Sequence, residues 1–168
     1  MSTDILTLTL TGTEVEQSPP AGVVLHGLDG TLAPDLAEVY LAGYPLGVAA
    51  ADLTEAREEM DATFRGEFGE LRDDASATAW LEGRLVGAIM VTTRSIWDEG
   101  LPGPFIIDLF TDPDARGRGV GRALVQHALS ACAAAGDSTL SLRIGEGTSP
   151  AAMSLYRSLG FRPLPRTA

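Results

Sequence analysis

Lysine is absent from this sequence of 168 residues, and cysteine occurs once. All 12 basic residues are therefore arginines, which excludes a Schiff-base lysine and the lysine of a Walker phosphate loop. The single Cys132 cannot form an internal disulfide or a multi-cysteine metal site, and its alanine-rich surroundings favour a packing role. The two histidines, His26 and His127, are too far apart in sequence to predict a metal site, so no metal is expected.

Long apolar runs are also missing. No run approaches the roughly 18 residues that a membrane-spanning helix needs, and the first residues, Met1 to Asp4, lead into no signal sequence. The 23 acidic residues outnumber the arginines and give a net charge of −11, which disfavours nucleic acid and anionic membranes as partners. We therefore expect a cytoplasmic protein whose acidic surface mildly favours cationic ligands.

The length and composition fit one folded domain. Hydrophobic residues make up 45% of the chain and charged residues 21%, close to the globular average. We expect a single domain over residues 1–168, in which residues 1–22 add an N-terminal strand and a loop rich in proline and glycine.

Hydrophobic periodicity predicts an alternation of strands and helices. Two helices are expected within residues 34–71, separated by Gly43, Pro45 and Gly47, because apolar residues there recur at spacings of three and four. Further helices are expected over 119–135, ending before Gly136, and from a Ser149 N-cap to Gly160. Strands are expected over 5–10, 23–25, 77–81, 84–91, 105–110 and 139–144. The order predicts a mixed α/β sheet, an α+β arrangement with a hairpin before the alternating half.

The most informative segment lies between a buried strand and a long helix, at Arg116-Gly117-Arg118-Gly119-Val120-Gly121-Arg122. Its glycines let the backbone approach a ligand, and the new helix offers unpaired N–H groups and the positive end of its dipole. Three arginines reverse the sign of the local charge in an acidic chain. The segment predicts a polyanion site; the alternative is a glycine-rich turn with solvated arginines.

This segment resembles the acyl-CoA loop of the GNAT superfamily of N-acetyltransferases, [QR]-x-x-G-x-[GA], at every fixed position from Arg116 to Gly121. A second motif of that family, N-x-x-A-x-x-L-Y-x-x-x-G-F, is met from Ala152 to Phe161, with Ser149 where asparagine is usual. The resemblance implies a GNAT-like acyl-CoA N-acyltransferase fold and direct transfer of the acetyl group of acetyl-CoA to a primary amine, with no metal cofactor.

The resemblance also implies roles for particular residues. Tyr156 matches the general acid that reprotonates the departing thiolate, and Asp108 stands where one of a pair of acids is found in polyamine acetyltransferases; the other position is Ile107. The main chain of β-strand residues would hold the pantetheine arm, and the loop and following motif would hold the pyrophosphate. These cofactor-binding candidates are Leu109, Phe110, Thr111, Arg116, Gly117, Arg118, Gly119, Val120, Gly121, Arg122 and Ser149.

The general base and the acceptor stay open at this point. An ionised Asp108 in an apolar strand is costly, so it is either functional or held by backbone donors, and Asp98, Glu99 or water are alternatives. The expected acceptor is a small cationic molecule or a peptide. Aromatic candidates for its binding walls are Tyr40, Tyr44, Phe64, Phe68 and Trp97.

Only seven residues follow Phe161, too few for the closing strand pair of the family. Either the strand over 5–10 or a second subunit would complete the sheet, and we predict a homodimer because an open apolar edge invites pairing. Two other functions are compatible with the residues. One is a catalytically silent acyl-CoA-binding regulatory module, suggested by Ile107 and Ser149; the other is a nucleotide sensor without CoA.

Overall fold

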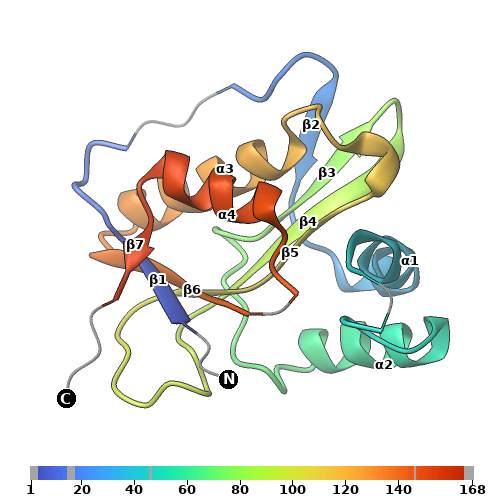
Figure 1. The fold of residues 1–168 in the computed structure, drawn as a ribbon, viewed down its shortest axis with the longest axis horizontal. Coiled ribbons are helices and arrows are strands. Elements are labelled where there is room, and N and C mark those ends of the chain that lie inside the picture. Colours follow the sequence, from blue (N-terminus) through green and yellow to red (C-terminus); the bar gives the residue numbers. More distant parts are fainter. Residues whose placement is uncertain (1–3, 15–17, 46, 146, 165–168) are drawn as a thin grey trace.

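A computed structural model of the protein describes residues 4–14, 18–45, 47–145 and 147–164. Within these ranges the strands form one seven-stranded sheet in the order β2-β3-β4-β5-β6-β1-β7 (Figure 1). The strands are β1 (Asp4–Thr9), β2 (Val23–His26), β3 (Ala77–Leu81), β4 (Arg84–Thr92), β5 (Phe105–Thr111), β6 (Thr139–Ile144) and β7 (Arg162–Pro163). The helices are α1 (Ala33–Gly43), α2 (Leu53–Phe64), α3 (Val120–Ala134) and α4 (Pro150–Leu159), with short 3-10 turns η1 (Gly30–Leu32) and η2 (Pro113–Ala115).

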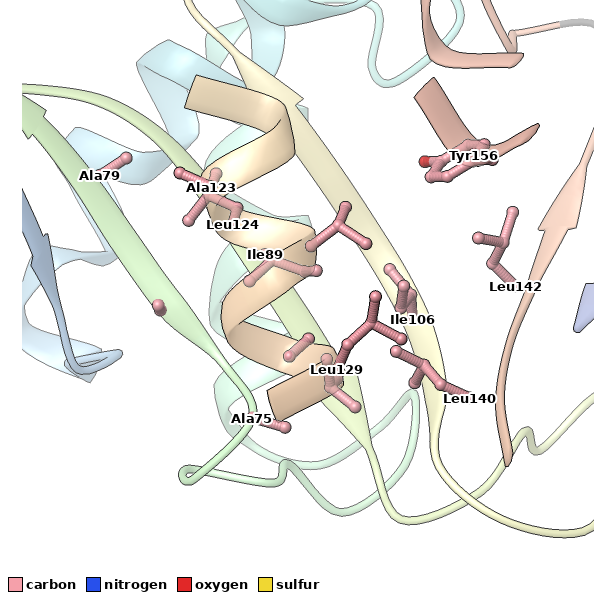
Figure 2. Packing of buried hydrophobic residues seen from close by; sticks show 14 of the residues in the cluster. Ala75, Ala79, Ile89, Ile106, Ala123, Leu124, Leu129, Leu140, Leu142 and Tyr156 are labelled. Atoms are coloured by element: carbon pink, nitrogen blue, oxygen red, sulfur yellow. The ribbon is translucent and has the colours of Figure 1, made fainter. Parts of the chain in front are cut away.

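The helices cover the two faces of this sheet. Figure 1 shows α1 and α2 on one face and α3 and α4 on the other. Two separate hydrophobic clusters result: one contains Leu124 of α3, Ile89 and Leu140, and the other contains Leu36 of α1 and Met60 of α2. Figure 2 shows the first cluster, with α3 lying across the strands. The predicted mixed α/β fold in one sheet is therefore confirmed.

The N-terminal strand closes the sheet beside β6. β1 runs antiparallel to β6 from Asp4↔Ile144 to Thr9↔Thr139, and its other side pairs with the two-residue β7. Its alternation of leucine and threonine has the predicted result, since Leu6 and Leu8 are buried. The Thr7 and Ser141 hydroxyls, which are 134 positions apart in sequence, bond at 2.9 Å. The edge is filled from within the chain, so the open-edge argument for a dimer no longer applies, and the dimer stays a prediction for sedimentation.

Strands β5 and β6 are parallel neighbours that pair only where β5 begins. Cα partners are found at Phe105↔Ser141 and Ile106↔Leu142, after which β5 continues to Thr111 without a partner on that side. On its other side β5 carries a bulge, because Asp108 pairs with Met90 and Ile106 pairs with the next residue, Val91. The extra residue, Ile107, lies at the point where the two parallel strands separate.

Local sequence signals set where α3 and α4 begin, beside the gap that opens between β5 and β6. The Ser149 hydroxyl accepts a hydrogen bond from the Ala152 N–H at 3.0 Å, with Pro150 at the first helical position, so the predicted N-cap of α4 is confirmed. Helix α3 begins after Gly119, whose left-handed φ of 79° allows the sharp turn from the loop. Both helix N-termini therefore face the region where β5 and β6 diverge.

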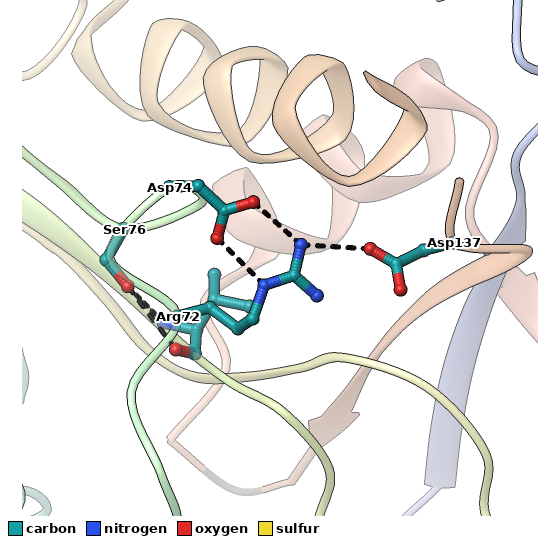
Figure 3. A network of polar contacts seen from close by, with 5 residues as sticks. Arg72, Asp74, Ser76 and Asp137 are labelled. Carbon is teal, nitrogen blue, oxygen red and sulfur yellow. Dashed lines mark hydrogen bonds and ion pairs between the residues drawn. The ribbon is translucent and has the colours of Figure 1, made fainter. Parts of the chain in front are cut away.

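A polar network fixes the opposite end of the sheet (Figure 3). The Arg72 guanidinium binds Asp74 through two hydrogen bonds of 2.8 Å and forms an ion pair with Asp137 at 3.0 Å. The Ser76 hydroxyl accepts from the Val91 N–H at 2.9 Å, which holds the same region of β4. This network joins the segment before β3 to the turn after α3, and it takes no part in the cavities described below.

Candidate active site

Two adjoining cavities occupy the gap between β5 and β6. The first, which we call the cleft cavity, has a volume of about 420 Å³ and is lined by Tyr44, Asp108 and Tyr156 among others. The second, the loop cavity, has a volume of about 320 Å³ and lies against the glycine loop from Arg116 to Arg122. They share five lining residues, Gly43, Leu109, Arg116, Ser149 and Ala152, so a long ligand can extend from one into the other.

The glycine loop exposes backbone amides to the loop cavity. Gly117 and Gly119 both have left-handed φ values, 78° and 79°, that side chains rarely adopt. A Cβ on Gly117 would meet open space, whereas one on Gly119 would lie 2.9 Å from Pro20 Cγ. The first bond of helix α3 joins the Ala123 N–H to the Gly119 carbonyl at 3.0 Å, so the amides before Ala123 have no acceptor within the helix. These amides and the helix dipole suit a phosphate group.

The three arginines of the loop have different positions. Arg116 and Arg122 line the loop cavity, where Arg116 donates to the Gly43 carbonyl at 3.2 Å and Arg122 donates to the Ser158 hydroxyl at 2.6 Å. Arg118 is exposed, is not part of the cavity lining, and extends toward Gly22. Arg116 and Arg122 are therefore the better placed cations for an anionic ligand.

The main chain of β5 faces the gap at alternate residues. The Phe110 carbonyl turns toward β4, because a Cβ built on Gly87 would lie 2.8 Å from its oxygen. The backbone N–H and C=O groups of Leu109 and Thr111 consequently point the other way, toward the gap. A Cβ built on Gly43 would lie 3.1 Å from the Thr111 carbonyl oxygen, so α1 approaches this edge closely. Of the three strand residues predicted to hold the arm, Leu109 and Thr111 direct their backbone groups toward the gap, and Phe110 directs its carbonyl toward β4.

Among the described residues, Asp108 is held by Tyr44, which directly follows α1, and not by backbone donors. The Tyr44 hydroxyl lies 2.9 Å from Asp108 Oδ1, to which it donates, and 3.3 Å from the Leu109 carbonyl oxygen. Burial raises the pKa of Asp108 from 3.8 to about 7; the Tyr44 bond lowers it and the charge of Glu59 raises it. Burial and the nearby Asp108 also raise the pKa of Tyr44, so this phenol stays a donor.

Tyr156 reaches the same cavity from the opposite face. It lies on α4, is 6% exposed, and packs edge-on against Phe161 with ring centroids 5.7 Å apart. Figure 2 shows its hydroxyl turned toward β5. Burial, and then the charge of Asp108, raise the pKa of Tyr156, so the phenol is protonated at neutral pH. The gap thus brings together the two predicted catalytic residues, one from each side of the sheet.

Comparison with known proteins identifies the family of the chain. The model of the acetyltransferase (GNAT) family matches residues 34–161, which include the gap, the glycine loop and Tyr156. The chain belongs to the GNAT family. Membership supports acyl transfer as its class of activity. No curated protein matches the chain.

Solved structures share the fold. The GCN5-related N-acetyltransferase from Sphaerobacter thermophilus aligns with a TM-score of 0.71 and 16% identity over 96% of this chain and 48% of its own. The ribosomal-protein-S18-alanine N-acetyltransferase from Escherichia coli aligns with a TM-score of 0.61 and 22% identity, over 83% of this chain and 77% of its own. PH1933 from Pyrococcus horikoshii OT3 aligns with a TM-score of 0.64 and 22% identity, over 87% of this chain and 92% of its own. This chain therefore spans about half the length of the Sphaerobacter protein.

Other acids are less suited to act as a base in this GNAT domain. Burial alone would raise the pKa of Asp98, but hydrogen bonds from Arg143 and Ser95 hold it below its ordinary value. Glu99 is exposed and lines neither cavity. Among the described residues no group of three or more histidine, cysteine, aspartate or glutamate side chains could hold a metal ion. In the same part of the chain, every helix is too short or too polar to cross a bilayer.

Ser149 and the aromatic candidates occupy distinct places. Ser149 lines both cavities, although its hydroxyl is used in capping α4. Tyr40 is buried beside Tyr44, and its hydroxyl donates to the Ala49 carbonyl at 3.3 Å. Trp97 lines a third cavity, described below. Sequence reasoning named Tyr44 only as a wall residue; its bond to Asp108 spans 64 positions, and no local pattern indicates it.

Proposed function

We propose that this protein transfers the acetyl group of acetyl-CoA directly to a primary amine of a small cationic molecule or a peptide. The observation that carries the proposal is the gap between β5 and β6, whose adjoining cavities connect the amides of the glycine loop with Asp108 and Tyr156. Such a path has room for a diphosphate at one end and a reacting thioester at the other.

The residues present fit acetyl-CoA. The amides at the start of α3, with the guanidinium groups of Arg116 and Arg122, would hold the pyrophosphate. The backbone groups of Leu109 and Thr111 would pair with the amides of the pantetheine arm, as an added strand does. When bound, the cofactor supplies an activated acetyl group, and the protein contributes chiefly position and amide donors for charge that develops on the carbonyl oxygen.

Asp108 would take the proton that the amine must lose. An ammonium group is not a nucleophile, so the attacking nitrogen needs its lone pair before the carbon–nitrogen bond forms. A carboxylate with a pKa of about 7 is half ionised near neutral pH and is a better base than an ordinary aspartate. The negative charge of Asp108 would also attract the cationic acceptor into the cleft cavity.

Tyr156 would supply the proton that the departing sulfur receives as the carbon–sulfur bond breaks. Its raised pKa keeps the proton on the phenol while Asp108 is ionised. Once Asp108 has accepted a proton from the amine, its charge no longer opposes ionisation of the phenol, and Tyr156 becomes a stronger acid. The two residues would therefore act in sequence, first the base and then the acid.

The experiment measures release of the CoA thiol from acetyl-CoA across a panel of amines and peptide N-termini. We expect turnover with at least one amine and a loss of about a hundredfold in kcat for Tyr156→Phe, the scale of general acid catalysis. Tyr40→Phe is the matched control, since that hydroxyl binds a backbone carbonyl outside the cavity and should change little. Tight CoA binding without turnover would favour the silent binding module, and failure to bind CoA would reject both.

A further inference from the structure

A third cavity, which we call the Trp97 groove, adjoins the cleft cavity. It has a volume of about 360 Å³ and is lined chiefly by apolar side chains of the loop before β5, of β5 and of β6. The residues that matter here are Trp97, Phe105, Ile106, Ile107, Arg143 and Ile144. Ile106, Ile107 and Arg143 also line the cleft cavity, so the two cavities adjoin at these residues.

The indole of Trp97 is half exposed yet fixed in place. Its exposed fraction is 51%, although its ring stacks on Phe68 at 6.2 Å and contacts Phe105 at 6.3 Å. The loop that carries it is held by the Ser95 hydroxyl, which donates to Asp98 at 2.7 Å, and by the ion pair of Asp98 with Arg143. An ordered aromatic surface that stays open to solvent is suited to bind an apolar group.

The spacing along β5 sets the reach of such a group. Phe105 and Asp108 pair with Thr92 and Met90, which are two residues apart on β4, because the bulge at Ile107 shortens β5 by one step. Strand residues rise about 3.3 Å each, so Phe105 lies roughly 7 Å along the strand from Asp108. A substrate whose amine meets Asp108 in the cleft cavity would therefore place a group roughly 7 Å away, at the level of Phe105, within the Trp97 groove.

The charge of the groove determines which chemical groups it can bind. Arg143 is the one charged residue among the described residues that line the groove, and its guanidinium is already ion-paired with Asp98, so the lining offers a second ammonium group no carboxylate partner. The side chains of the neighbouring isoleucines contain no hydrogen-bond acceptor for a second ammonium group. We propose that the Trp97 groove binds an apolar, preferably aromatic, group of the acceptor, so that the substrates are monoamines with such a group and not polyamines. This inference rests on the proposed acetyltransferase function.

The test compares two four-carbon amines, 4-phenylbutylamine and 1,4-diaminobutane, with propylamine as the reference. Release of CoA thiol gives kcat/KM, and calorimetry gives the affinity of each amine for the CoA-loaded protein. We expect 4-phenylbutylamine to exceed propylamine by about tenfold or more in both, because a buried aromatic group contributes more than one factor of ten. The diamine should show no such gain.

Three variants at two adjacent residues make the test specific. Trp97→Ala should lower the ratio of kcat/KM for 4-phenylbutylamine to kcat/KM for propylamine to about the ratio seen for the diamine, while Trp97→Phe should keep most of the preference for 4-phenylbutylamine. Ile96→Ala is the matched control: Ile96 is 49% exposed but does not line the groove, so its loss should have no effect. Equal preference in Trp97→Ala and the unaltered protein, or a stronger gain for the diamine, would overturn the inference. Absence of CoA binding would instead reject the acetyltransferase function.

Discussion

Replacing Tyr44 by phenylalanine should raise the pKa of Asp108 further. The Tyr44 hydroxyl donates to Asp108 at 2.9 Å, and this bond stabilises the ionised carboxylate that burial destabilises. A hydrogen bond to a charged group contributes about 1.5 to 3 kcal/mol, and one pKa unit corresponds to about 1.4 kcal/mol. The substitution should therefore move the pKa of Asp108 from about 7 to roughly 8 or 9.

Carbon-13 NMR of the Asp108 carboxyl group, assigned by its absence in Asp108→Asn, measures this change without any assumption about activity. The rise of kcat/KM with pH should move in the same direction, because only the ionised carboxylate can accept a proton. Tyr40→Phe, four residues earlier on α1, is the control; its hydroxyl bonds to the Ala49 carbonyl. An Asp108 titration that is the same in Tyr44→Phe and in the unaltered protein would refute the reasoning.

Three further changes test the surroundings of the cavities. Gly43→Ala places a methyl group against β5 and should weaken CoA binding about tenfold by calorimetry, whereas Gly27→Ala, which meets open space, should not. Gly117→Ala and Gly119→Ala both force a side chain into a left-handed backbone, at about 1 to 2 kcal/mol each in urea unfolding. Gly119→Ala should cost more than this, because its methyl also meets the proline-rich segment; equal losses would contradict that contact. Folding retains the Asp108 proton, because the pKa of Asp108 is higher in the folded protein than in the unfolded chain, so the unaltered protein loses stability as pH rises from 4 to 9. Asp108→Asn lacks this loss, and its free energy of unfolding should rise relative to that of the unaltered protein by up to roughly 4 kcal/mol over the same range. Parallel pH profiles of the two free energies would contradict the raised pKa.

Most of the secondary structure could be predicted because its signals are local. The strand over 139–144 and the helix after Ser149 begin where the sequence places them, since periodicity, an N-cap and a first-turn proline act within a few residues. The position of β1 was one of two predicted alternatives. Its pairing with β6 depends on a contact across most of the chain, which periodicity does not specify.

The candidate site was predictable in part for the same reason. The glycine loop has a contiguous motif, and the structure places Arg116, Gly117, Gly119 and Arg122 around one cavity. The bulge at Ile107 lies beside Asp108, the residue that binds Tyr44, and no sequence pattern within this apolar run predicts it. The direction of Arg118 away from the cavity likewise depends on tertiary packing.

The insertion of β1 between β6 and β7 has a consequence for how the chain folds. Strand β1 is synthesised more than a hundred residues before its partner β6, and closing so large a loop is slow compared with forming the β3–β4 hairpin. Until then the leucine side of β1 and the outer edge of β6 both stay uncovered. The first strand along the chain is thus among the last to reach its place, and β6 depends on it for protection against aggregation while the protein is being made.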